Sequence, residues 1–470
     1  MKRVAVIGGG IGGMTAAGEL AAAGHQVTLF ERGSRLGGKA QGIAKGGVVL
    51  DTGPTLLTLP EVVRETFRRL SALDLLPRFV ELTLQCAYRW SDGARFEAHR
   101  SLEATAASAE RLKAGEGEAV RAFYAAAAEI HRAAGEPYLE APLEGTLEYM
   151  LRVARRGLDA VRTGARLPTL DAFAAQHFAT AHLRQFVGRF ATYAGASPYE
   201  ASAAFALIPH LEHARGVHHV EGGMGALAAA LEQALARLGV KVHLDAAASW
   251  QRRGHRFAAG PDGGQELYDA VVVNADPLAS LGRSSERLAL SGYVLLLETE
   301  RLPLAHHTVT FASDYRAEFE ALFAGRVADD VTFYVCHPAA TDAAMAPAGK
   351  SGLFVMVNAP VLGDCGDFGA EAARLKERCL AHVRSLGARE VTVLGERTPA
   401  DLARAGAPRG SIYGFLPHGR FGPFRRPRIR SRTPGLFYSG GGTHPGGGVP
   451  LVMLSGHFAA QLAGRHLEGR

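Results

Sequence analysis

The sequence predicts an α/β protein in which a parallel-sheet domain is interrupted by two insertions. Three stretches predict the sheet domain, because each combines short apolar strands with a glycine turn and a helix: residues 4–30, 216–273 and 435–460. Between them, residues 71–204 are largely alanine-rich and helical in pattern, whereas residues 291–429 hold strand-like apolar runs. We therefore expect a discontinuous sheet domain, a helical insertion and a second sheet.

The length of 470 residues is consistent with two or three domains. We expect the sheet domain to consist of residues 1–70, 205–290 and 430–470. Residues 71–204 would form the helical insertion, and residues 291–429 would form the domain with the second, mixed sheet.

The opening unit predicts a site for an ADP-containing cofactor. A buried strand at residues 4–7 is followed at once by Gly8, Gly10 and Gly13, which complete G-x-G-x-x-G. The first glycine permits a tight turn, the second lets the backbone approach a pyrophosphate, and the third lets the helix pack on the strand. Glu31 ends the next strand, where a carboxylate accepts hydrogen bonds from ribose hydroxyls. The pattern is that of a Rossmann-type domain, which binds either NAD or FAD.

A second glycine element favours FAD. Residues 35–39, Arg-Leu-Gly-Gly-Lys, resemble the element that continues the diphosphate and ribityl site in amine oxidase and carotenoid desaturase flavoproteins. Lys39 would supply the cation there. Near the other end of the chain, residues 440–448 hold six glycines just before a helix that is expected to begin near Val449 or Pro450. Such a turn points backbone N–H groups at an electron-rich ring edge.

Composition excludes several classes of function. The net charge of +6 and pI near 9.2 come largely from arginine-rich segments with no aromatic stacking platform between them, so we expect no nucleic-acid partner. No 18-residue uncharged apolar run predicts a membrane-spanning helix. Glycines interrupt the apolar start, which argues against a signal peptide, and four scattered cysteines indicate a reducing, cytoplasmic compartment.

We expect no metal site. The cysteines lack C-x-x-C spacing, and the histidines at 218–219 and 306–307 are adjacent pairs that would not face one way on a helix. Ser-His-Asp order, H-E-x-x-H and a Walker lysine are also missing from the sequence, so hydrolase, metalloprotease and P-loop functions are unsupported.

Taken together, the motifs resemble those of the bacterial carotenoid desaturases, which include phytoene desaturase, over essentially the whole chain. The segments that carry this resemblance are the fingerprint, 51–55 (DTGPT), 197–198 with 206–212 (ALIPHLE), 274–276 (NAD), 410–414 (GSIYG), 441–446 (GGTHPG) and 448–450 (GVP). Residues 304–315 and 413–427 are closer to the hydroxycarotenoid 3,4-desaturases than to enzymes acting on phytoene. The resemblance implies FAD as the sole redox cofactor, a long polyene substrate and a peripheral association with the cytoplasmic membrane.

On this resemblance, the helical insertion would contact both the substrate and an anionic membrane surface, and the second-sheet domain would hold the substrate. Residues 145–170 combine apolar side chains with arginines at 152, 155, 156, 162 and 166, a pattern that suits an anionic bilayer surface or a solvated basic helix. The residues expected to bind FAD are Gly8, Gly10, Ile11, Gly12, Gly13, Glu31, Arg32, Gly38, Lys39, Gly53, Pro54, Thr55, Leu56, Ala248, Asn274, Gly441, Gly442, Gly448, Val449 and Leu451.

Desaturation removes a hydride and a proton from neighbouring carbons, and oxidised flavin accepts the hydride at N5. Because the positive charge left on the substrate spreads along the polyene, positioning and exclusion of water carry much of the acceleration. Candidate proton acceptors are His444, Glu212 and Asp314, each of which has an alternative structural role. The sequence identifies no electron acceptor.

We expect 3,4-desaturation of a 1-hydroxycarotenoid. Three alternatives stay open at this point: a phytoene-type desaturase acting on unhydroxylated carotenoids, an amine-oxidase-like flavin oxidase, and a protein that binds an isoprenoid without redox chemistry.

Overall fold

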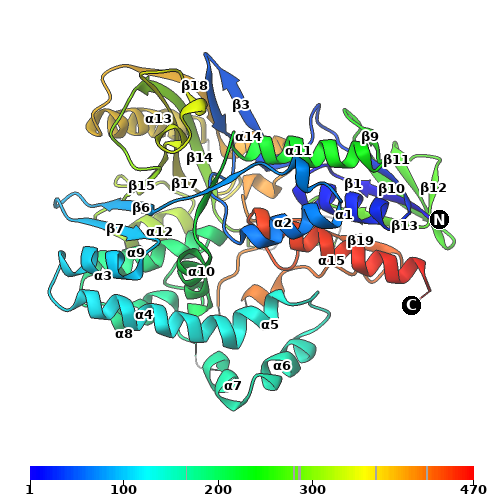
Figure 1. Cartoon of the computed structure of the whole chain (residues 1–470), viewed down its shortest axis with the longest axis horizontal. Helices are drawn as coiled ribbons and strands as arrows, with labels where there is room; N and C mark the ends of the chain where they lie inside the picture. The colour runs from blue at the N-terminus through cyan, green and yellow to red at the C-terminus, as the bar shows by residue number, and fades with distance from the viewer. Residues whose placement is uncertain (166, 279–280, 284–286, 366–367, 420–421, 470) are drawn as a thin grey trace.

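The first sheet consists of five parallel strands that come from the beginning, middle and end of the chain (Figure 1). The computed structural model describes residues 1–165, 167–278, 281–283, 287–365, 368–419 and 422–469. In sheet order the strands are β19 (Leu436–Tyr438), β13 (Ala270–Val273), β1 (Arg3–Ile7), β2 (Gln26–Phe30) and β9 (Lys241–His243). The central β1 pairs on both sides, with Val4 opposite Ala270 and Val27.

The two faces of this sheet are covered differently because successive side chains of a strand point to opposite sides. Val4 and Val6 face a helical layer, whereas Ala5 faces a small antiparallel sheet. The helices are α1 (Ile11–Ala22), α2 (Pro60–Arg69), α11 (Met224–Arg237) and α15 (Val449–Leu467). The small sheet consists of β10 (Ala248–Arg253), β11 (Arg256–Pro261) and β12 (Leu267–Tyr268).

Glycines let the two helices that lead into the site approach one another. A Cβ atom on Gly12 of α1 would lie 3.0 Å from the Val452 carbonyl oxygen, and one on Gly456 of α15 would lie 2.3 Å from the Gly12 carbonyl oxygen. Helices α1 and α15 therefore pack backbone to backbone, and this contact fixes their N-termini side by side.

The second sheet is mixed and has seven strands. Its centre is the antiparallel pair β14 and β17, ten residues each, in a register that sets Ser291 opposite Ala359. In sheet order the strands are β18 (Val391–Arg397), β14 (Ser291–Glu300), β17 (Lys350–Ala359), β16 (Phe333–Cys336), β15 (His307–Thr310), β6 (Leu84–Arg89) and β7 (Arg95–His99). Helix α13 (Phe368–Ser385) packs on one face.

Two of these strands, β6 and β7, come from the segment that the sequence predicts to be largely helical. They form a short hairpin whose inward side chains alternate, with Tyr88 and Phe96 buried. After this hairpin the segment is helical: α3 (Leu102–Glu110), α4 (Glu116–Ile130), α5 (Glu136–Leu139), α6 (Thr146–Arg155), α7 (Leu158–Ala165), α8 (Leu170–His177) and α9 (Ala181–Gly188). Helices α6 and α7 project from the body at the lower edge of Figure 1.

The remaining elements join these layers. They are β3 (Gly42–Lys45), β4 (Val48–Asp51), β5 (Phe79–Glu81), β8 (His218–Val220), α10 (Leu207–Arg215), α12 (Tyr315–Phe323) and α14 (Pro399–Arg404). Among the described residues, none of the helices combines the length and the apolar character needed to cross a bilayer.

Candidate flavin and substrate site

A cavity of about 1430 Å³ opens at the carboxyl ends of the parallel strands and runs toward the second sheet and the helical region. Its lining begins at Ile7, the last residue of β1, at Glu31 after β2 and at Asn274 after β13. Ligands of open α/β sheets bind at this edge, near the point where the strand order reverses. The cavity exceeds the volume of an ordinary single-ligand pocket, so it has room for a dinucleotide and a second long molecule.

The N-terminus of α1 supplies free backbone donors to the cavity. Gly8 has a φ of 103°, and among the described residues no side chain caps the helix, which begins after Gly10. The Asn274 amide donates to the Gly8 carbonyl oxygen at 3.3 Å and its oxygen accepts from the Ser439 hydroxyl at 3.1 Å. This amide thereby joins the first glycine turn to the last one.

Glu31 is already held by backbone donors. Its carboxylate accepts from the N–H of Gly9 and from the N–H of Gly33, each at 2.7 Å, and it lines the cavity. These bonds fix the carboxylate at the end of β2, where the ribose hydroxyls of a dinucleotide would lie. Arg32 also lines the cavity, and its guanidinium donates to the Arg404 carbonyl oxygen at 2.9 Å.

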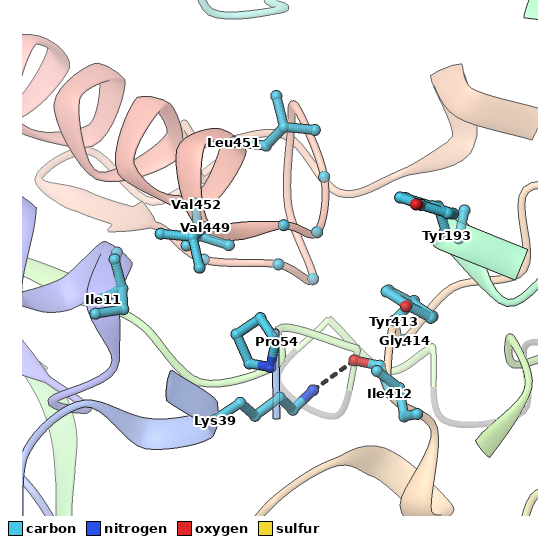
Figure 2. A pocket seen from close by; sticks show the side chains of 18 of the residues that line it. Ile11, Lys39, Pro54, Tyr193, Ile412, Tyr413, Gly414, Val449, Leu451 and Val452 are labelled. Carbon is cyan, nitrogen blue, oxygen red and sulfur yellow. Dashed lines mark hydrogen bonds between the residues drawn. The ribbon is translucent and has the colours of Figure 1, made fainter. Parts of the chain in front are cut away.

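Lys39 crosses the cavity floor. Figure 2 shows its ammonium reaching the Ile412 carbonyl oxygen, with Pro54 beside it and Tyr413 beyond. The surrounding protein desolvates this group and lowers the pKa of Lys39 to about 8, although a nearby acid, Asp276, opposes the shift. Burial raises the pKa of Asp276 in turn.

A second uncapped helix N-terminus meets the first. Helix α15 begins at Val449 after Gly448, whose φ of 102° favours glycine, and no described side chain caps it. Gly53 faces the same space, where a Cβ would lie 2.0 Å from the Lys39 carbonyl oxygen. Two sets of free N–H groups, close-packed glycines and a lysine fit an anionic, ring-bearing dinucleotide such as FAD.

Nearly all of the residues expected to bind the cofactor line this one cavity. Gly13 is the exception: it lies behind the turn, where its role is the close packing of α1. The sequence prediction omitted Asp276, Arg426 and the 412–414 turn, which also line the cavity. Arg426 is buried and donates to the Gly441 carbonyl oxygen at 2.6 Å. The polar turn after β13 was the available signal for Asp276.

None of the three candidate proton acceptors is among the described residues that line the cavity. His444 is buried with its ring 4.6 Å from that of Tyr138, and burial lowers its pKa to about 3. Asp314 is an N-cap that accepts from the Ala317 N–H. Glu212 is buried behind Tyr193, which lines the cavity, and its carboxylate accepts from the Tyr193 hydroxyl at 2.7 Å. These positions favour their structural roles over direct proton transfer.

The far part of the cavity is apolar with a few polar groups. Arg189 is buried between the hydroxyls of Tyr88 and Tyr193, to which it donates at 3.0 and 3.2 Å. Tyr193 and Tyr413 lie on the side of the cavity away from the first helix in Figure 2. Tyr315 also lines the cavity, and its buried hydroxyl has no hydrogen-bond partner in the described chain. The sequence analysis contained Tyr315 and Tyr413 only within longer segments that carry the resemblance, and it named neither as a site residue.

Comparison with known proteins agrees with this geometry. The model of the flavin containing amine oxidoreductases matches residues 11–463, and the chain belongs to that family. It is therefore a FAD-dependent oxidoreductase. Among solved structures, an oxidoreductase from Methanosarcina mazei (TM-score 0.63, 17% identity, 98% of this chain and 100% of that one) shares the fold. A putrescine oxidase variant does so too (TM-score 0.65, 15% identity, 100% and 99%).

Within this family the chain is one of the bacterial carotenoid desaturases. It is 34% identical to hydroxyneurosporene desaturase of Cereibacter sphaeroides over 100% of this chain and 99% of that one. It is 30% identical to the zeta-carotene-forming phytoene desaturase of Myxococcus xanthus (100% and 95%). It is 27% identical to a 1-hydroxycarotenoid 3,4-desaturase of a Flavobacterium species (98% and 99%).

Proposed function

We propose that this protein introduces the 3,4 double bond into an acyclic 1-hydroxycarotenoid. The observation that carries the proposal is one cavity that joins a dinucleotide site to a mostly apolar chamber. This chamber contains the hydroxyl of Tyr315, which has no hydrogen-bond partner among the described residues. Relatives named for hydroxyneurosporene and 1-hydroxycarotenoid desaturation over nearly their full length support the substrate class.

Bound FAD would supply a hydride acceptor at its N5 atom. The chain's own contribution is to orient the polyene and to keep water from it, since the apolar walls solvate a delocalised charge without trapping it. The proton of the neighbouring carbon would pass to a polar group of the cavity wall. The two electrons held by the reduced cofactor would then pass to an external acceptor.

We assign the hydroxylated chain end to the neighbourhood of Tyr315. A buried hydroxyl without a partner costs free energy that a substrate hydroxyl would recover. Tyr315 belongs to the 304–315 stretch that resembles the hydroxycarotenoid enzymes. Arg189 lies in the same chamber, where hydrogen bonds to the hydroxyls of Tyr88 and Tyr193 fix the direction of its guanidinium.

We also propose that α6 and α7 rest on a membrane and admit the substrate. Their inner faces line the cavity through Tyr149, Val153 and Val161. Their outer faces expose Leu147 (73%) and Leu158 (75%). Exposed apolar side chains scattered singly are normal, whereas a cluster of them on two adjacent helices marks an interaction surface. Such a patch beside an opening suits a carotenoid that arrives from a bilayer.

The arginine contribution to this surface is smaller than the sequence indicates. Arg152 points inward, where it donates to the carbonyl oxygens of Ala141 and Pro142 and pairs with Glu148. Arg156 pairs with Glu136. Arg155 is exposed, and Arg166 lies outside the described residues. The apolar side chains are therefore the stronger element of the proposed contact.

The test is turnover of purified, flavin-loaded protein with a panel of acyclic carotenoids and an artificial electron acceptor. We expect conversion of 1-hydroxylated substrates with a red shift in absorption as conjugation lengthens, and little conversion of phytoene. Efficient conversion of phytoene without preference for hydroxylated compounds would favour the phytoene-type alternative and overturn the 3,4-desaturase proposal.

A further inference from the structure

Three buried side chains of types that can bind a metal ion lie close together next to the cavity, outside its lining. His307 opens β15 and sits opposite Cys336 in the antiparallel ladder with β16, so their side chains share one face of the sheet. His306 precedes the strand. One ring nitrogen of each histidine and the Cys336 sulfur lie within 4.8 Å of one another, and all three residues are at least 95% buried.

We propose that His306, His307 and Cys336 bind one thiophilic divalent cation of the zinc class. Two imidazoles and a thiol are ligands that zinc prefers, whereas magnesium and calcium prefer oxygen. Three protein ligands leave a fourth position for water or another small ligand.

The hydrogen bonds of the two rings orient them for this role. His306 shares its Nδ1 with the Thr341 hydroxyl at 2.7 Å, and His307 shares its Nδ1 with the Tyr334 hydroxyl at 2.8 Å. A proton held on Nδ1 leaves the lone pair on Nε2, and this is how metal-binding histidines are usually fixed. Both Nε2 atoms are buried and have no hydrogen-bond partner among the residues described. An ion bound through these two Nε2 atoms would give each of them a partner.

A negative charge lies close to the cluster. Asp342 pairs with His219 at 3.2 Å, and the His219 ring lies 5.0 Å from that of His306. Binding of a divalent cation by the Cys336 sulfur would release the thiol proton to solvent.

The expectation of no metal site assumed that adjacent histidines lie on a helix. They lie instead at the entry to a strand, where the chain bends before His307 begins to pair, and this lets neighbouring rings converge on Cys336. Cys336 lies on β16, far in the sequence from the two histidines, so the sequence alone does not show that it lies beside them.

The ion would brace the site, because the same hydrogen bonds lead to the cavity. The Tyr334 hydroxyl also shares a bond of 2.6 Å with the Thr55 hydroxyl, and both residues line the cavity. The three ligands do not line it in the described chain. We therefore assign the cation a positioning role on the Thr55 turn rather than a role in hydride transfer.

Elemental analysis of the flavin-loaded protein, produced with zinc in the medium, tests the site. We expect about one zinc per chain, and a loss of roughly tenfold or more in Cys336→Ala and in His306→Gln. Cys379→Ala and His382→Gln are matched controls, since Cys379 is buried in a different core, His382 is half-buried on the same helix α13, and neither belongs to the cluster. These controls should keep the full zinc content.

A second measurement covers a variant that fails to fold. Chelator-treated wild-type protein should gain thermal stability on addition of Zn²⁺, and Co²⁺ should produce a thiolate charge-transfer band and visible d–d bands that are absent in Cys336→Ser. Wild-type protein without zinc that responds to neither ion would overturn the proposal. So would a Cys336→Ala variant that retains as much zinc as the wild type.

Discussion

Glu31 illustrates how one carboxylate prepares a cofactor site. Its two backbone hydrogen bonds hold it rigid at the end of β2, so it accepts ribose hydroxyls without reorganisation. We predict that Glu31→Ala weakens FAD binding by about tenfold to a hundredfold, as expected for the loss of hydrogen bonds to a charged group. The flavin-to-protein absorbance ratio measures this. Glu232→Ala, which removes an exposed acid from α11, should purify with full flavin; equal occupancy in both variants would contradict the assignment.

Tyr315 provides the residue-scale test of substrate choice. Its hydroxyl is expected to receive the substrate hydroxyl, so Tyr315→Phe should remove a preference without removing the reaction. We predict that the ratio of kcat/KM for hydroxylated over unhydroxylated substrates falls about tenfold, the equivalent of one hydrogen bond. Tyr124→Phe, a buried change in the helical core, is the control. An unchanged ratio would move the hydroxyl site elsewhere in the chamber.

Glu318 predicts a pH dependence of stability. The side chain is buried on α12 and accepts from the backbone N–H and the hydroxyl of Thr332, and desolvation raises its pKa from 4.5 to about 7. The folded protein then holds a proton that the unfolded chain releases, so the free energy of unfolding falls as pH rises from about 4.5 to 7. At 1.4 kcal/mol per pKa unit, the free energy of unfolding falls by at most about 3 to 4 kcal/mol.

We therefore predict that Glu318→Gln raises the Tm relative to wild type more at pH 8 than at pH 5. Thermal unfolding at both pH values measures it, and Glu320→Gln, an exposed change on the same helix, should leave the difference between the two pH values unaltered. A Glu318→Gln variant that loses more stability at pH 8 than at pH 5 would refute the sign.

At the scale of elements, the sequence predicted best what local chemistry determines. The bounds of β1, α1, β2 and the start of α15 follow from glycine turns next to apolar runs, and these elements carry most of the flavin site. The β6–β7 hairpin was missed because its inward residues alternate over a few positions inside a helical pattern. The hairpin pairs with β15, more than 200 residues away, and no local signal records that pairing.

The sequence could not show, for the same reason, that the candidate proton acceptors lie outside the cavity lining. His444 sits in a turn that does meet the cavity through its neighbours Pro445 and Gly446, but its own ring turns toward Tyr138. Side-chain direction depends on packing against α5, which sequence spacing does not specify. The cluster of His306, His307 and Cys336 likewise needs the strand register before it is visible.

The proposed membrane contact belongs to α6 and α7. Leu147 and Leu151 lie one helical turn apart on α6, and Leu158 lies on α7. We predict that changing all three leucines to serine lowers co-sedimentation of the protein with anionic vesicles severalfold. Because the contact is expected to be mainly apolar, the decrease should be the same at low and at high salt. Leu73→Ser changes a leucine that is 51% exposed outside these helices and should have no effect. Unchanged sedimentation of the triple variant would retire this surface.

At the scale of the whole molecule, the cofactor should connect parts of the chain that are distant in sequence. Residues that line the proposed FAD part of the cavity come from three parts of the chain, 8–59, 246–276 and 397–452. FAD would therefore contact the first sheet, the turn after β18 and the glycine turn before α15 at the same time. A ligand that binds only the folded state stabilises it by RT ln(1 + [L]/Kd). Removal of FAD should therefore lower the Tm by an amount that depends on cofactor concentration.

We predict that this loss is local in amide hydrogen exchange. Without FAD, protection should fall at the glycine turns around residues 37–56 and 440–452, whose backbone is open to the cavity. It should persist in β14 and β17, because their ten-residue pairing and the apolar core under α13 contain none of the proposed flavin contacts near the helix N-termini. Exchange mapped by mass spectrometry on flavin-free and reconstituted protein measures the difference. A uniform loss of protection across both sheets would instead mean that the flavin holds the entire chain together, and that neither sheet keeps its structure without it.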